Sequence, residues 1–229
     1  MNYFLYISYV AMLFCITMCL IHFFRIIKLG VPKDLSEKSG SISAGVLYSN
    51  TVAMSPVNKE SAYKHLPTFT AGMLFHLGTF LALFVFLLLF FNAMWDFFFK
   101  YTIISSIIML CMWLSTCCGI GLIIKRMISK KLRPISNADD YISVSLTTLF
   151  QLLTALLFTT FAFHDRFHQF FSSEVHGWII IAYMLMPTLL FLYLPFGKLK
   201  HVVYYFDARF QLGFFYGRRG TWPPKKTEG

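Results

Sequence analysis

Long apolar runs alternate with short polar stretches along almost the whole chain. An α-helix rises about 1.5 Å per residue, so about 20 apolar residues cross the hydrocarbon core of a bilayer, which is about 30 Å thick. Five runs reach this length, at residues 3–24, 68–92, 101–124, 141–163 and 177–197, and the last can continue to Phe206. The pattern predicts an all-α membrane protein, with a bundle of five transmembrane helices over residues 1–206 and a tail at 207–229.

The polar connections leave no room for a soluble domain. The longest, residues 25–67, is rich in Ser, Lys and Gly, and we expect it to lie along the membrane surface. The first run lacks the basic n-region and the small-residue cleavage site of a signal peptide, so we expect it to remain as a helix. The composition fits this class, since only 13% of the residues are charged, against about 25% in soluble domains.

The basic residues predict an orientation. Of the 20 Lys and Arg residues, 18 fall in the segment 25–67, the loop 125–140 and the region after residue 197, whereas Lys100 and Arg166 fall on the other side. Cytoplasmic loops carry an excess of Lys and Arg, so we predict the N-terminus outside and the C-terminus in the cytoplasm. The net charge of +10 follows from this asymmetry and requires no nucleic acid.

The cysteines and the charged residues indicate no catalytic centre. All five cysteines lie in apolar runs, and no CxxC or CxxCH motif is present, which argues against c-type haem, an Fe–S cluster and a zinc knuckle. No nucleophile, acid–base pair or metal-activated water is apparent. We therefore expect no catalysis by the chain alone.

The histidines are the candidate ligands. His76 lies inside the second run, and ionisable groups within a membrane are functional candidates by default; the alternative is a neutral imidazole hydrogen-bonded to a neighbouring helix. Five others lie near the predicted membrane surfaces or in the outer loop: His22, His65, His164, His168 and His176. For the three in or beside the outer loop, a solvated position and a metal or haem role both remain open.

His201 forms a candidate pair with His76. It closes the segment Pro195-Phe196-Gly197-Lys198-Leu199-Lys200-His201, and the predicted topology places both histidines in the same half of the membrane. Two neutral imidazoles on different helices can hold one haem iron from opposite sides. Lys198 and Lys200 flank this site, where they either meet haem propionates or act as plain cytoplasmic anchors.

These motifs carry a resemblance to a known family. Leu74-Phe75-His76-Leu77-Gly78 and the segment 195–201, with Arg209-Phe210-Gln211-Leu212-Gly213 and Gly217-Arg218-Arg219-Gly220, resemble the cytochrome b (gamma) subunit family of respiratory nitrate reductase. Within it, the chain looks most like the small membrane cytochrome b subunits of Hmc, Tmc and Dsr-type transmembrane redox complexes. The resemblance covers nearly the whole chain.

The resemblance implies that His76 and His201 ligate a haem b on the cytoplasmic side. Many members hold a second haem nearer the outside, but its ligand positions correspond to Phe86 and Tyr183 here. We therefore expect one haem. The family's quinone site lies near that outer haem and is not carried over, although a quinone remains a candidate ligand.

The function implied is that of a haem-b membrane anchor subunit of a respiratory complex in a bacterial or archaeal inner membrane. It would transfer electrons between the quinone pool, or a periplasmic multihaem cytochrome c, and a cytoplasmic Fe–S subunit of the heterodisulfide-reductase type. Other membrane subunits are further expected partners. Two alternatives remain: a haem-free structural anchor, and a small transporter, against which the absence of internal charges and of an inverted repeat argues.

The tail is a candidate docking surface for the Fe–S subunit. Residues 204–224 combine eight aromatic side chains with Arg209, Arg218 and Arg219. Aromatics and arginines dominate protein interfaces. The same composition also suits an amphipathic segment on the inner leaflet, which is the alternative.

Overall fold

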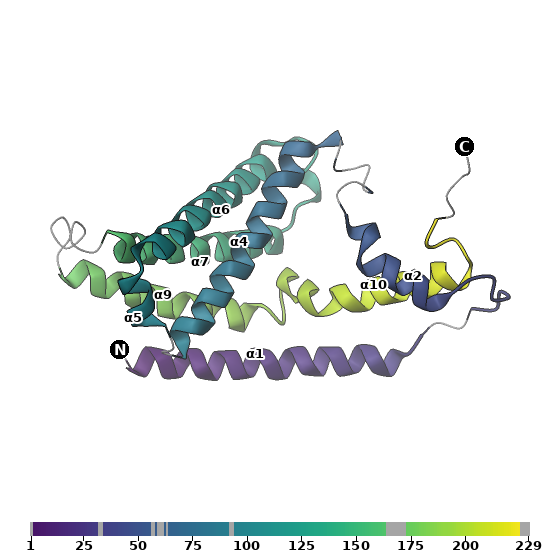
Figure 1. Ribbon diagram of the computed structural model, residues 1–229, viewed down its shortest axis with the longest axis horizontal. Coiled ribbons are helices and arrows are strands. Elements are labelled where there is room, and N and C mark those ends of the chain that lie inside the picture. Colours follow the sequence, from purple (N-terminus) through teal and green to yellow (C-terminus); the bar gives the residue numbers. More distant parts are fainter. Residues whose placement is uncertain are drawn as a thin grey trace. The chain divides into compact units, whose positions relative to one another are not determined.

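The computed structural model consists of helices joined by short connections (Figure 1). It describes residues 2–31, 34–55, 58, 62, 64–91, 94–163 and 173–224. Within these residues every regular element is a helix and no strand occurs. Four helices are long and apolar enough to cross a membrane, or five if α9 and α10 count as one broken span. The predicted all-α fold is confirmed, and the described helices are long and apolar enough for several membrane spans, while the orientation of the termini remains a prediction.

The first four predicted spans correspond to long helices within a few residues. They are α1 (Asn2–Leu29), α4 (Leu66–Phe90), α6 (Thr102–Ile128) and α7 (Ala138–Ala162). α6 extends beyond the apolar run through Lys125 and Arg126, whose charges are favourable near a helix C-terminus. α7 begins at a capping box, in which Asn137 and Asp140 each accept a hydrogen bond from the other's backbone N–H.

The fifth predicted span, residues 177–197, is interrupted. α9 (Ser173–Tyr193) ends two residues before Pro195, the short 3-10 helix η4 (Lys198–Lys200) follows, and α10 (His201–Arg218) begins directly after it. Proline disfavours helical geometry in the residue before it, which accounts for an end near this point. The predicted boundary between residues 206 and 207 therefore falls inside α10.

The helices form two compact units, which are considered separately here. The first comprises Met1–Cys15 and Pro67–Lys198, and the second Ile16–Leu66 and Leu199–Gly229. In the first unit α7 packs against α6 and α9. Its core is aromatic, with the side chains of Phe86, Phe150, Phe158 and Tyr183 fully buried. Short elements in this unit are α5 (Trp95–Lys100) and η3 (Arg133–Ile135).

Small and polar side chains connect the helices of the first unit. A Cβ on Gly78 would lie 2.0 Å from Ser115 Oγ, so α4 crosses α6 closely at this glycine. Gln151 of α7 donates hydrogen bonds to the carbonyl of Phe75 (2.9 Å) and to Thr79 Oγ1 (2.7 Å), both on α4. Hydrogen bonds between helices substitute for the weak hydrophobic drive within a bilayer.

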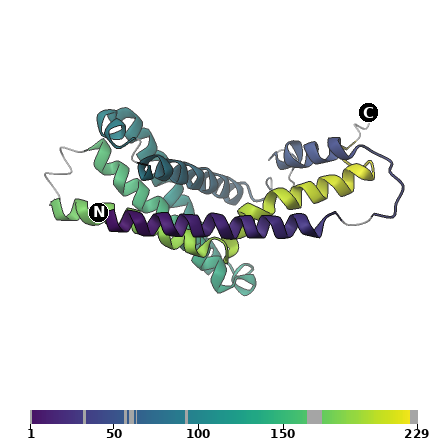
Figure 2. The ribbon, with the colours of Figure 1, turned by 90° about the horizontal axis from the view of Figure 1, so that it is seen from below.

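The second unit contains a pair of helices that the sequence pattern does not predict. α2 (Ile42–Asn50) lies beside α10 in both views (Figures 1 and 2), and the short η1 (Val52–Met54) follows it. Their backbones meet at glycines, since a Cβ on Gly45 would lie 2.4 Å from both Gly213 O and Gly217 Cα. Part of the polar segment 25–67 is thus packed on the C-terminal helix.

Candidate functional site

His76 lies well inside α4. It follows Leu66, the first residue of the helix, by ten residues, which is about 15 Å along the axis. Its imidazole is exposed, and its Nδ1 lies 2.7 Å from the carbonyl oxygen of Gly72. Because a carbonyl only accepts, Nδ1 carries the proton and Nε2 carries the ring's lone pair. This is the tautomer and the backbone hydrogen bond commonly found in metal-ligating histidines.

The surface around His76 is apolar. Met73, Leu77, Phe80 and Phe84, one to eight residues away at helical spacing, are all exposed, with Leu77 and Phe80 at 59% each. α4 therefore presents an uncovered apolar face with one imidazole near its middle. A polar ring facing lipid is costly, so this face is suited to a flat apolar group that engages the imidazole.

His201 and the two candidate lysines lie around the break between α9 and α10. His201 is the first residue of α10, Lys200 is its N-cap, and both are exposed. Lys198 is also exposed and ion-pairs with Asp140 at 2.5 Å. An ammonium has three donors, so Lys198 can hold Asp140 and still meet a propionate.

His76 and His201 belong to different compact units. Their pairing on one iron therefore remains a prediction. In the second unit, His22 of α1 lies 3.2 Å from the hydroxyl of Tyr204, one turn after His201. His65 is an exposed turn residue immediately before α4.

The positions expected for the ligands of an outer haem are part of the packed core. Phe86 and Tyr183 are both fully buried, with ring centroids 6.0 Å apart, and Phe150 stacks on Tyr183 at 6.2 Å. These rings fill the interior between α4, α7 and α9. The number of haems remains a prediction. His164 and His168 lie outside the described residues, as does the side chain of His176.

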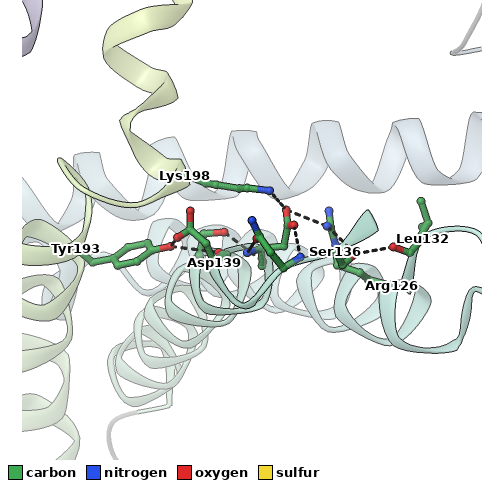
Figure 3. Close-up of polar contacts among 9 residues, drawn as sticks. Arg126, Leu132, Ser136, Asp139, Tyr193 and Lys198 are labelled. Atoms are coloured by element: carbon green, nitrogen blue, oxygen red, sulfur yellow. Dashed lines mark hydrogen bonds and ion pairs between the residues drawn. The ribbon is translucent and has the colours of Figure 1, made fainter. Parts of the chain in front are cut away.

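An ionic cluster lies at the N-terminus of α7, and sequence reasoning missed it (Figure 3). Asp140 is 7% exposed and pairs with Arg126 at 2.9 Å and with Lys198 at 2.5 Å. The spacing Asn137-x-x-Asp140 before an apolar run is a capping signal that could have identified this carboxylate. Among the described residues, no group of three or more His, Cys, Asp or Glu side chains gathers as a metal site. A haem iron needs only two ligating side chains, so a haem site does not require such a group.

The arginines of the predicted docking tail have partners inside the second unit. Arg209 Nε donates to the carbonyl of Ser49 at 2.8 Å, and Arg218 Nη2 donates to the carbonyl of Ser36 at 2.9 Å. Arg219 ion-pairs with Asp34 at 3.2 Å. Hydrogen bonds from Arg219 and then from Ser36 hold the pKa of the Asp34 carboxyl well below its usual range.

No family model, curated protein or solved structure matches this chain. The resemblance described above therefore rests on the sequence motifs, and the function is argued from the residues of the site.

Proposed function

We propose that this chain is a haem-b membrane anchor subunit of a respiratory complex. It relays electrons between the quinone pool, or a periplasmic cytochrome c, and a cytoplasmic Fe–S subunit. The basic residues place the C-terminus and the loop 125–140 in the cytoplasm and the N-terminus outside. The membrane is a bacterial or archaeal cytoplasmic membrane, as the resemblance implies.

The observation that carries this proposal is the imidazole of His76. It is an ionisable group about 15 Å into a membrane-spanning helix, it is exposed on an apolar face, and its Nδ1 hydrogen bond to Gly72 presents Nε2 as the ligand atom. Such a residue fits a haem better than a structural role, because a structural imidazole in a membrane is normally buried against a neighbouring helix.

The roles of the residues follow from this assignment. His76 and His201 hold the iron, and Lys200 and Lys198 meet the propionates at the membrane surface. A bound haem supplies one-electron transfer, and the chain sets its potential through the axial ligands and the apolar surroundings. The chain itself needs no acid, base or nucleophile.

The cytoplasmic partner docks on the second unit. Arg209, Arg218 and Arg219 are engaged within the unit, and the exposed side chains of α10 include an apolar strip of Val202, Phe206 and Phe210, spaced four residues apart. A strip of this kind directly after His201 suits a subunit that must bring a cluster near the haem. If the strip lies instead on the inner leaflet, truncation after Tyr205 will leave every soluble subunit bound.

A reduced-minus-oxidised optical spectrum of the purified protein tests the proposal. We expect a low-spin b-type spectrum with one haem per chain by pyridine haemochrome assay. His76→Ala and His201→Ala should each abolish it. His65→Ala changes an exposed histidine immediately before α4 and should retain it. A normal spectrum in either ligand variant would refute the assignment, and a wild-type chain without haem would favour the structural anchor.

A further inference from the structure

The turn between α9 and α10 is tightly wound. The N–H groups of Phe196 and Gly197 both donate to the carbonyl of Tyr193, at 3.1 and 2.9 Å. The ring of Tyr193 then packs onto Gly197, where an added Cβ would lie 2.1 Å from the ring's Cζ. Only glycine leaves room for this ring.

Two adjacent carboxylates of α7 hold both ends of this turn (Figure 3). Before it, the hydroxyl of Tyr193 donates to the carboxylate of Asp139 and, at 3.2 Å, to the carbonyl of the same residue. After it, Lys198 ion-pairs with Asp140 at 2.5 Å. The turn is therefore clamped to the first turn of α7 at residues 193 and 198.

Asp140 is itself firmly placed. Its carboxylate accepts the backbone N–H of Asn137 at 3.0 Å, and its own N–H donates to the Asn137 side chain at 3.0 Å. Arg126 of α6 reaches the same oxygen as Lys198, at 2.9 Å, and also donates to Ser136. Two cations share one nearly buried carboxylate, so its loss leaves both of them without their counter-charge.

From this geometry we propose that Asp140 is a positioning residue for the haem ligand His201. By holding Lys198, it restrains the chain three residues before the histidine. This proposal rests on the proposed function, because the contacts of Asp140 can position a haem ligand only if His201 ligates a haem. Lys198 then has two roles, the ion pair with Asp140 and a contact to a propionate.

The test compares Asp140→Asn with wild type in the full chain reconstituted in nanodiscs. The first measurement is hydrogen exchange of the amides of Leu194, Phe196 and Gly197, whose N–H groups are hydrogen-bonded at the end of α9 and in the turn. We expect exchange to rise on the order of tenfold, as for loss of hydrogen bonds to a charged group. The second is the haem itself, by electron paramagnetic resonance and redox titration. We expect altered low-spin g-values and a shifted midpoint potential, both restored by Asp140→Glu.

Asp96→Asn, the same change at an exposed carboxylate of α5, is the matched control and should change neither measurement. If Asp140→Asn is not recovered, Lys198→Gln breaks the same ion pair from its exposed partner and should give the same rise in exchange. Its haem signals are not compared, because Lys198 is also assigned to a propionate. If Asp140→Asn contains haem and its exchange is unchanged, this proposal is overturned, while the proposed function stands. Faster exchange with an unaltered haem would also overturn this proposal, since the clamp would then be only structural. A wild-type protein without haem would refute the proposed function and this proposal together.

Discussion

Replacing Gly45 by alanine tests the contact between α2 and α10 in the second unit. The new Cβ would lie 2.4 Å from Gly213 O and 2.4 Å from Gly217 Cα. Both are backbone atoms, which cannot rotate away as a side chain can. Because ordinary contacts begin near 3.4 Å, the two helices must separate by about 1 Å.

The cost follows from what this separation breaks. Ser49 Oγ donates to the carbonyl of Arg209 at 2.6 Å, and the N–H of Gly40 donates to the carbonyl of Arg218 at 3.1 Å. An added 1 Å ends both bonds, at about 1 kcal/mol each, and overpacking costs a further 1–3 kcal/mol or so. The better helix propensity of alanine returns about 1 kcal/mol. The net destabilisation is about 3 kcal/mol, or roughly a hundredfold in the opening equilibrium.

Hydrogen exchange of the α2 amides in the reconstituted protein measures this effect. Gly45→Ala should accelerate their exchange roughly a hundredfold. The control is Gly121→Ala in α6, where an added Cβ meets nothing within 4 Å and exchange should be unchanged or slower. If Gly45→Ala changes the exchange of the α2 amides by less than about threefold, the backbone contact between α2 and α10 is refuted. Overpacking on this scale cannot be absorbed without separating the two helices.

Two further outcomes follow from the polar contacts. Gln151→Leu removes the hydrogen bonds to Phe75 and Thr79 and should destabilise the fold by about 1 kcal/mol, as for interhelical bonds in membranes. The thermal midpoint should fall by about 3 °C, and an unchanged midpoint would contradict this prediction. Arg219 holds the pKa of the Asp34 carboxyl below its usual range. The stabilisation by this ion pair is therefore fully present at any pH above the ordinary Asp pKa of about 3.9, and it is lost only as the pH falls through the lowered pKa of Asp34. Exchange of the 39–40 amides, corrected for its intrinsic rate, should therefore be flat between about pH 5 and 8, and Asp34→Asn should raise it throughout.

The membrane-spanning helices were predictable because each corresponds to a long apolar run in the sequence. An apolar run of sufficient length can satisfy its backbone only as a helix, so α4, α6 and α7 lie within a few residues of their runs. α2 was not predictable, because a nine-residue helix with serines and a glycine is not stable alone. It forms on α10, which is about 160 residues further along the chain.

The candidate haem ligands stand out in the sequence, whereas the contacts around them do not. His76 stands out in the sequence because it interrupts an apolar run, and His201 because it closes the segment 195–201. The break between α9 and α10 was not predicted, since the apolar run was allowed to continue to Phe206. The contacts of Asp140 do not stand out, since its partners Arg126 and Lys198 come from two other elements and read as cytoplasmic anchors. The arginines of the tail were assigned to a partner for the same reason: their carbonyl and carboxylate acceptors at residues 34–49 are remote in sequence.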